Sequence, residues 1–211
     1  MYVAIEGVIG VGKTTLARLL QPVFNAELLL EIFEENPFLS DFYADRERYA
    51  FQTQIFFLLS RYHQQRRTVQ AILASGKDLV ADYTFAKDAL FAQINLKGDE
   101  LDMYYKVHEA LAEKIQKPDL LVYLQASTDT LMQRIAFRDR PYERQMDRSY
   151  IDDVNRAYER FFAQPFDHTP VLTIETDNLN YVQNPEHLKL IESRIRESLK
   201  LPPFQQTLPL P

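Results

Sequence analysis

Short apolar runs alternate along the chain with longer stretches in which apolar positions recur every three or four residues. The runs predict buried strands, and the recurring positions predict helices with one apolar face. Strands are expected at residues 2–5, 27–32, 79–81, 120–124 and 171–174. Helices are expected over the stretch that holds Leu16, Leu19 and Leu20, after a cap at Ser127 or Thr128, and at 45–75, 85–96, 100–115, 150–162 and 185–199. This alternation predicts an α/β fold, a five-stranded parallel sheet with helices on both faces.

A glycine-rich segment separates the first expected strand from the first expected helix and fits the pattern G-x-x-x-x-G-K-[ST]. Between a strand and a helix, this pattern is typical of a phosphate-binding loop rather than of a simple glycine turn. Its backbone N–H groups surround an anion at the positive end of the helix dipole. The lysine would reach the β- and γ-phosphates, and the threonine hydroxyl would bind Mg²⁺. The nucleotide-binding residues are therefore expected to be Gly7, Val8, Ile9, Gly10, Val11, Gly12, Lys13, Thr14 and Thr15.

Two carboxylates are expected beside this loop, because the carboxyl ends of parallel strands meet at one edge of a sheet. Glu31 directly follows an apolar run and is the candidate base for an acceptor hydroxyl. Glu34 and Glu35 are its alternatives, unless the cluster is only a solvated acidic turn. Asp82 ends the third expected strand and is a candidate for holding Mg²⁺, directly or through water, with a helix N-cap as the other interpretation. Together they indicate phosphoryl transfer.

Arginines mark a possible lid in the second half of the chain. Arg134 and Arg138 lie four residues apart and share a helix face, and Arg140 follows two positions later. Guanidinium groups bind phosphate oxygens in a bidentate manner. The segment 134–149 is therefore predicted to close over phosphates, with an exposed basic face as the alternative.

Composition limits the class of partner. The chain has 211 residues, a formal net charge of −6 and no cysteine. These values predict one domain over about residues 1–200 that acts on a small molecule and not on nucleic acid, without thiol or disulfide chemistry. The first residues enter a strand and no apolar run reaches membrane-spanning length, so a cytoplasmic enzyme without membrane contact is expected. The proline-rich segment 201–211 is expected to be an extended or disordered tail.

Together the motifs resemble the deoxyribonucleoside kinase family, specifically its bacterial deoxyguanosine and deoxyadenosine kinase branch. The likeness spans nearly the whole chain, up to about residue 195. Besides the phosphate loop, it rests on the order and spacing of segments 31–38, 51–57 with 60–61, 81–84, 88–91 and 134–143. The resemblance implies a P-loop kinase that uses ATP and Mg²⁺ to phosphorylate the 5′-hydroxyl of a purine deoxynucleoside. Members are commonly homodimers through their long helices.

The resemblance also implies roles for individual residues. Glu31 matches the general base, and the lid arginines match the three named above. The deoxynucleoside would be bound by Gln54 at the base edge, by the pair Arg61 and Asp88 behind the base, by Phe91 as a stacking ring, and by Tyr43 and Glu143 at the 3′-hydroxyl. On their spacing alone, Gln54 and Arg61, seven residues apart on the long helix, would be taken for surface polar residues.

One position departs from the family pattern. The carboxylate at the end of the third strand is usually followed by an arginine, and here Tyr83 follows Asp82. Either another cation substitutes for that arginine, or proton transfer at Glu31 is tuned differently.

The polar groups expected around the nucleobase favour guanine. The amide of Gln54 can pair with adenine or, after flipping, with guanine. Arg61 only donates, which suits the O6 and N7 acceptors of guanine, and a charge-assisted pair with Asp88 would leave it spare donors. We therefore expect deoxyguanosine to be preferred and deoxyadenosine to be next, followed by deoxycytidine and thymidine.

Two other functions fit part of the pattern. A nucleoside monophosphate kinase shares the loop and the arginine lid, but it needs a cationic site for the acceptor phosphate, which Arg61 could supply. A non-catalytic P-loop regulator of the GTPase type is the second alternative. The sequence lacks the N-K-x-D signature of guanine-binding switches, and residues 86–88 come closest without the asparagine.

Overall fold

The computed structural model describes all residues except 33–34, 145, 165–168 and 204–211. Its five strands form one parallel sheet in the order β2-β3-β1-β4-β5, which confirms the predicted fold class. Most of the predicted tail, residues 204–211, lies outside the described residues. The strands are β1 (Tyr2–Gly7), β2 (Glu27–Leu29), β3 (Leu79–Ala81), β4 (Leu120–Gln125) and β5 (Val171–Glu175).

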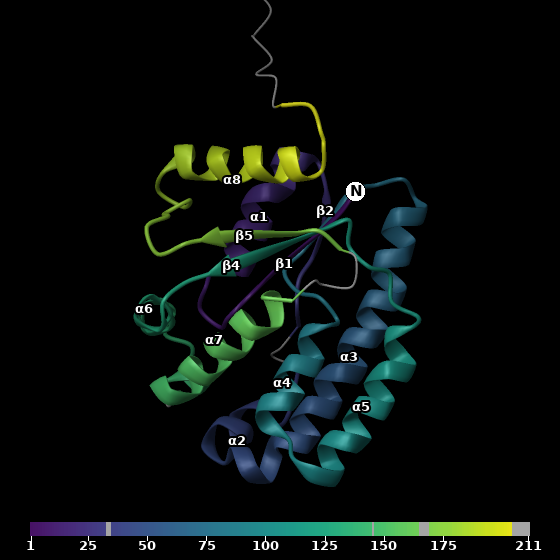
Figure 1. Cartoon of the computed structure of the whole chain (residues 1–211), viewed down its shortest axis with the longest axis vertical. Helices are drawn as coiled ribbons and strands as arrows, with labels where there is room; N and C mark the ends of the chain where they lie inside the picture. The colour runs from purple at the N-terminus through teal and green to yellow at the C-terminus, as the bar shows by residue number, and fades with distance from the viewer. Residues whose placement is uncertain (33–34, 145, 165–168, 204–211) are drawn as a thin grey trace, which may run out of the picture.

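Helices cover both faces of this sheet, as predicted. Figure 1 shows α1 and α8 on one face and α3, α4, α5 and α7 on the other. The helices are α1 (Lys13–Phe24), α2 (Leu39–Ala44), α3 (Arg46–Ala74), α4 (Lys87–Asn95), α5 (Gly98–Ala112), α6 (Thr128–Arg138), α7 (Arg148–Phe162) and α8 (Pro185–Ser198), with a 3₁₀ turn, η1 (Pro141–Glu143). The short helix α2 was not predicted, because six residues are too few to show a helical period.

The second strand is shorter than predicted, and the difference shapes the site. It ends at Leu29, three residues before the predicted end at residue 32. The next two residues bond to side chains: the carbonyl of Leu30 accepts from Gln64 Nε2 at 2.9 Å, and the N–H of Glu31 donates to Asp82 Oδ1 at 2.7 Å. The chain thereby leaves the sheet with Glu31 held beside the end of β3.

Central strand β1 places the glycine loop at the carboxyl edge of the sheet. Ala4 of β1 lies opposite Ala81 of β3, and Gly7 lies opposite Leu124 of β4. The loop after β1 and the chain leaving β3 therefore begin at the same edge, which is where parallel sheets bind their ligands.

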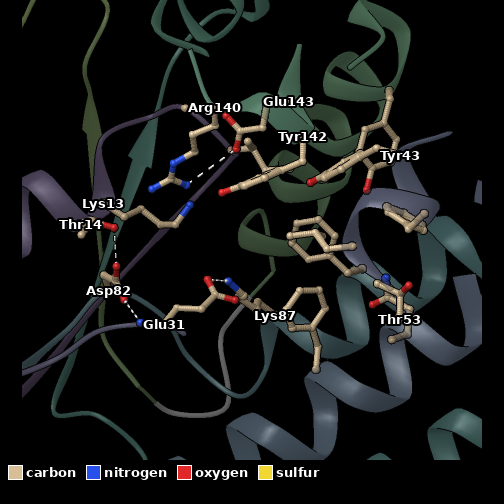
Figure 2. Close-up of a pocket in the computed structure, with 18 of the residues that line it drawn as sticks. Lys13, Thr14, Glu31, Tyr43, Thr53, Asp82, Lys87, Arg140, Tyr142 and Glu143 are labelled. Carbon is tan, nitrogen blue, oxygen red and sulfur yellow. Dashed lines mark hydrogen bonds and ion pairs between the residues drawn. The ribbon is translucent and has the colours of Figure 1, made fainter. Parts of the chain in front are cut away.

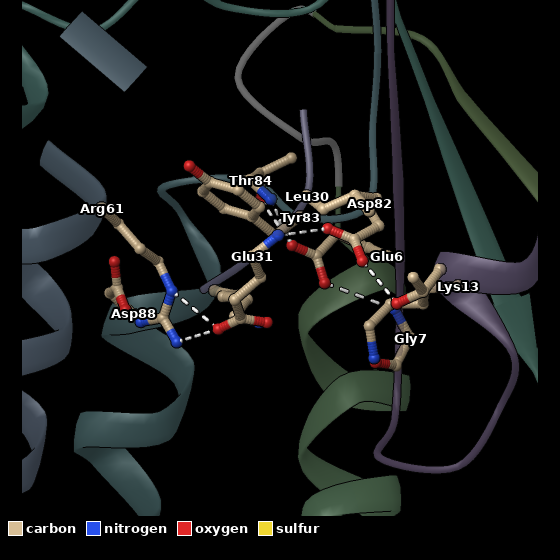
Figure 3. A network of polar contacts seen from close by, with 12 residues as sticks. Glu6, Gly7, Lys13, Leu30, Glu31, Arg61, Asp82, Tyr83, Thr84 and Asp88 are labelled. Atoms are coloured by element: carbon tan, nitrogen blue, oxygen red, sulfur yellow. Dashed lines mark hydrogen bonds and ion pairs between the residues drawn. The ribbon is translucent and has the colours of Figure 1, made fainter. Parts of the chain in front are cut away.

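A buried carboxylate connects this edge to the helices. Glu6, with 1% of its surface exposed, accepts hydrogen bonds from the Thr84 N–H at 2.6 Å, the Thr84 hydroxyl at 2.9 Å and the Tyr158 hydroxyl at 3.1 Å. Figure 3 shows Glu6 and Thr84 beside the loop. One side chain thus links β1, the segment after β3 and helix α7, although Glu6 directly follows the apolar run 2–5 and was not predicted to have a role.

We expect Glu6→Ala to lower the free energy of unfolding by about 2–4 kcal/mol, because it leaves buried donors without an acceptor. Urea unfolding measures the change. Glu159→Ala, at an exposed position of α7, is the control and should change stability by less than about 0.5 kcal/mol. Equal effects of the two substitutions would contradict the linking role of Glu6.

Candidate active site

The backbone of the glycine loop turns sharply at positions whose conformation favours glycine. Gly10 and Gly12 have φ values of 90° and 104°, in the left-handed region that side chains avoid. A Cβ atom on Gly12 would lie 2.3 Å from the hydroxyl oxygen of Tyr181, so no larger residue fits. Val8 and Val11 are buried beneath the loop, and Ile9 lines the cleft above it. The predicted loop is therefore present, with Thr15 exposed in the first turn of α1.

Lys13 is turned onto the loop itself. Its Nζ donates to the carbonyl oxygens of Gly7 at 2.6 Å and Val8 at 3.2 Å. Burial, and next the positive charge of Lys87, lower the pKa of Lys13 to about 8, against opposing carboxylate charges. Lys13 therefore loses its proton more easily than an ordinary lysine, and nearby charges alter the pKa at which it does so.

Thr14 and Asp82, the two predicted metal ligands, are adjacent. The Thr14 hydroxyl donates to Asp82 Oδ2 at 2.5 Å, while Asp82 Oδ1 is fixed by the N–H of Glu31. Burial raises the pKa of Asp82, more than the hydrogen bond from Thr14 lowers it. Within the described part of the chain, no three His, Cys, Asp or Glu side chains converge as in an all-protein metal cage. One hydroxyl and one carboxylate nevertheless fit Mg²⁺, which takes few protein ligands and keeps water and phosphate oxygens.

Glu31 is held by two cations. Its Oε1 accepts hydrogen bonds from Nε of Arg61 at 3.0 Å and from a terminal nitrogen of the same guanidinium, and its Oε2 lies 2.5 Å from Lys87 Nζ. Burial alone would raise the pKa of Glu31, but the charges of Arg61 and then of Lys87, with their hydrogen bonds, hold it well below its ordinary value. Glu31 is therefore an ionised carboxylate with a fixed orientation.

The far end of the same cleft contains the residues predicted to read a base. Arg61 forms a buried ion pair with Asp88, as predicted, and its guanidinium lies 4.5 Å from the centre of the Phe57 ring. Gln54 is 3% exposed and lines the same cleft, as Phe91 does. Lys13, Thr14, Glu31, Gln54 and Arg61 thus line one cleft, and Figure 3 shows Glu31 between Lys13 and Arg61.

Two of the three predicted lid arginines, Arg138 and Arg140, lie in the cleft beside Glu143. Arg138 donates from Nε to Glu143 at 2.6 Å and contacts the same carboxylate through a second nitrogen, and Arg140 lies 3.8 Å from it. Both arginines and Glu143 line the cleft. Tyr43 also lines it, and its ring stacks on Tyr142 at 6.3 Å between centres (Figure 2).

Arg134 lies elsewhere, behind the phosphate loop. It donates to the carbonyl oxygen of Val11 at 3.1 Å, to the Thr176 hydroxyl at 2.9 Å and to the Thr176 carbonyl at 2.6 Å. In this structure it joins the loop to the segment after β5, whereas we had predicted that it faces the phosphates with the other two arginines. Its direct action on phosphate stays a prediction.

Lys87 is the site residue that sequence reasoning missed. It lines the cleft and is buried, yet it fell inside a predicted helix as an ordinary charged position. The available signal was its place in the first turn of that helix, where the dipole disfavours a cation. A lysine in the first turn of a predicted helix can therefore indicate a nearby carboxylate that compensates its charge.

A parallel sheet with a phosphate loop after its central strand, an adjacent hydroxyl and carboxylate that fit Mg²⁺, and two arginines of the predicted lid in one cleft are the features of a P-loop kinase. Comparison with known protein families identifies which kind of P-loop kinase this is. The family model described as deoxynucleoside kinase matches residues 3–200, and the chain belongs to that family.

Its relatives agree. The chain is 36% identical over 199 residues to a deoxyguanosine kinase of Bacillus subtilis, covering 93% of this chain and 96% of the relative. It is 33% identical over 204 residues to a deoxyadenosine kinase of Dictyostelium discoideum, covering 94% and 80%. The solved deoxyadenosine kinase of M. mycoides with bound dCTP superposes with a TM-score of 0.80 at 25% identity, covering 93% of this chain and 100% of that one.

The protein is therefore an enzyme that transfers phosphate from a nucleoside triphosphate to an alcohol group of a small deoxynucleoside. This membership decides against both a monophosphate kinase and a non-catalytic regulator. Among the described residues, no helix is both long and apolar enough to cross a bilayer.

Nucleotide binding should raise the pKa of Lys13 from about 8 towards its ordinary value, because phosphate favours the protonated amine. Near pH 9 the free lysine is mostly neutral, so binding of Mg²⁺–ATP should take up close to one proton there. Near pH 7 the lysine is already protonated and contributes little uptake. Calorimetry in buffers of different ionisation enthalpy measures the uptake.

Lys13→Arg is the matched control for this measurement, because its guanidinium stays protonated at both pH values. It should show no uptake near pH 9. The same uptake in Lys13→Arg as in the wild type would assign the proton to another group.

Proposed function

We propose that this enzyme phosphorylates the 5′-hydroxyl of purine deoxynucleosides with ATP and prefers deoxyguanosine. The observation that carries the proposal is the position of Glu31, between the phosphate loop and the base-reading end of one cleft. A nucleoside bound at Gln54 and Arg61 would direct its 5′-end towards that carboxylate. The names of the relatives, two purine deoxynucleoside kinases, support the same substrate class.

Glu31 would accept the hydrogen bond of the acceptor hydroxyl and finally its proton. Because Arg61 and Lys87 hold the pKa of Glu31 low, the carboxylate is ionised throughout the physiological range. A low pKa also makes it a weak base. This suits phosphoryl transfer, whose transition state is loose and is stabilised mainly by positioning and charge.

The donor would be held at the other end of the cleft. The loop N–H groups and Lys13 would bind the phosphates, and Thr14 and Asp82 would hold Mg²⁺, which neutralises charge on the phosphate oxygens when bound. Arg138 and Arg140 would contact the transferring group from the lid. Beside its predicted action on phosphate, Arg134 would support the loop, since its three hydrogen bonds join the loop to the segment after β5.

The acceptor sugar and base would be recognised by the rest of the cleft. Tyr43 and Glu143 would bind the 3′-hydroxyl, and Phe91 would stack on the base. Arg61 uses three of its five N–H donors on Glu31 and Asp88 among the described residues, so two remain for acceptors on the base. Guanine offers two such acceptors, O6 and N7.

We also propose a homodimer through the long helices. Leu59 on α3 and Met103 on α5 expose 41% and 53% of their surfaces, and the two helices pack against each other. A second copy would cover these apolar side chains.

A substrate panel tests the proposed function. We expect kcat/KM to fall in the order deoxyguanosine, deoxyadenosine, deoxycytidine and thymidine, because a pyrimidine leaves donors directed at N7 unsatisfied at a cost of about 1–3 kcal/mol. Steady-state assays with ATP and Mg²⁺ give the order, with deoxyguanosine monophosphate as an acceptor that should not react. A pyrimidine at the top would overturn the purine assignment and leave the kinase assignment intact.

Glu31→Gln should lower kcat roughly 10²-fold, the usual effect of losing a general base. The protein should still fold, although Arg61 and Lys87 lose a charged partner. Glu35→Gln, at an exposed position four residues later, is the control and should keep wild-type turnover. Near-normal kcat in Glu31→Gln together with a loss in Glu35→Gln would transfer the role to Glu35.

A further inference from the structure

A buried lysine lies beside the proposed base. Lys87 is the first residue of α4, and its Nζ lies 2.5 Å from Oε2 of Glu31. The lysine side chain is 6% exposed and the glutamate side chain 15%. Figure 2 shows the two groups directed towards each other, in the cleft that Lys13 also lines.

This position is unfavourable for a lysine on two grounds. The N-terminus of a helix is the positive end of its dipole, which destabilises a cation there. Burial also removes the water that hydrates the ammonium group. Glu31 offsets both effects, as the one carboxylate with an ion pair to Lys87 among the described residues. Local rules are typically broken in this way at functional sites.

The two cations on Glu31 hold different oxygens of its carboxylate. Arg61 contacts Oε1 and is also paired with Asp88. Lys87 contacts Oε2 at 2.5 Å, and its positive charge also contributes, after burial, to the lowered pKa of Lys13. Arg61 is therefore shared between two carboxylates, whereas Lys87 is paired with Glu31.

Tyr83 does not occupy this place. Its hydroxyl donates to Gln64 Oε1 at 2.6 Å, and Gln64 Nε2 in turn donates to the carbonyl of Leu30. Its ring centre lies 5.9 Å from Nζ of Lys87. Tyr83 thus supports the end of β2 and lies beside the lysine, while the positive charge comes from the residue four positions later.

We propose that Lys87 is a positioning residue of the transfer reaction, whose ammonium group holds the Glu31 carboxylate towards the 5′-hydroxyl in place of the arginine expected at position 83. The inference rests on the proposed function. In the reaction, the 5′-oxygen bonds to the γ-phosphorus while the bond from that phosphorus to the β,γ-bridging oxygen breaks and ADP leaves. The hydroxyl proton passes to Glu31, and Lys87 keeps its protons.

Three substitutions test whether the reaction depends on the positive charge of Lys87 or only on the shape of its side chain. Lys87→Gln keeps a hydrogen-bond donor without the charge and should lower kcat roughly 10- to 100-fold, with KM for the deoxynucleoside changed less than about threefold. Lys87→Arg restores the charge and should recover at least about tenfold of that loss. Lys97→Gln, at an exposed position, should behave as the wild type. If Lys87→Gln does not fold by circular dichroism, Lys87→Met replaces it.

The pH profile of kcat distinguishes positioning from a merely structural role. The wild type should be flat from about pH 5 to 7, because Glu31 is ionised throughout. Removing the Lys87 charge raises the pKa of Glu31, so kcat of Lys87→Gln should fall at a higher pH on the acid side. Among the described residues, the titratable or charged groups that act on Glu31 are Arg61, Lys87, Lys13, Asp82, Tyr83 and Tyr158.

The outcomes are distinct. Wild-type kcat and an unshifted acid limb in Lys87→Gln would overturn the role of Lys87, as would a Lys87→Arg variant no better than Lys87→Gln. A wild-type enzyme that phosphorylates no deoxynucleoside would instead overturn the proposed function on which the inference rests.

Discussion

Charge compensation within a largely buried cleft is the constraint on which the rest of the site depends. Apart from the lid residues Arg138, Arg140 and Glu143, three cations and three carboxylates meet there, and the formal charges of these six groups sum to zero: Lys13, Arg61 and Lys87 with Glu31, Asp82 and Asp88. An uncompensated ion in such surroundings loses several kcal/mol of hydration. The six groups come from α1, α3, α4 and the chain leaving β2 and β3. The same ionic contacts that make burial tolerable therefore also fix these elements relative to one another.

A balanced cleft suits an acceptor that carries no charge. A deoxynucleoside brings none, and its hydroxyl needs only an acceptor of fixed orientation. A nucleoside monophosphate would instead need extra positive charge, yet Arg61 is already shared between two carboxylates. The negative charge of the donor arrives at the loop end, beside Lys13 and opposite the lid arginines Arg138 and Arg140. The positive charge near the loop thus favours the phosphates of the donor, and the balanced charges around Glu31 favour an uncharged acceptor.

The sequence predicted those features that follow from local pattern. Buried strands show as apolar runs, and the glycine loop shows as a motif whose left-handed φ values at Gly10 and Gly12 exclude other residues. What it could not predict depends on how elements are oriented towards each other. Arg134 and Arg138 share a helix face, yet one turn of helix is enough to put the first against Val11 and the second against Glu143. Lys87 was missed for the same reason, since it lies on α4 and its partner Glu31 lies in the segment after β2.

The pair of cations on Glu31 fixes the orientation of that carboxylate at the expense of its strength as a base. Its pKa is held low, so in the proposed reaction the proton would pass to it only late, when the bond to phosphorus has largely formed. Arg61 makes this property dependent on the nucleobase. A base that draws the guanidinium towards its own acceptors weakens the hold on Glu31 and raises its pKa, which makes it a better proton acceptor. A base without such acceptors leaves Arg61 entirely on the two carboxylates and Glu31 at its weakest. If Glu31 and Arg61 act as proposed, recognition of the base and activation of the hydroxyl are joined through one guanidinium group.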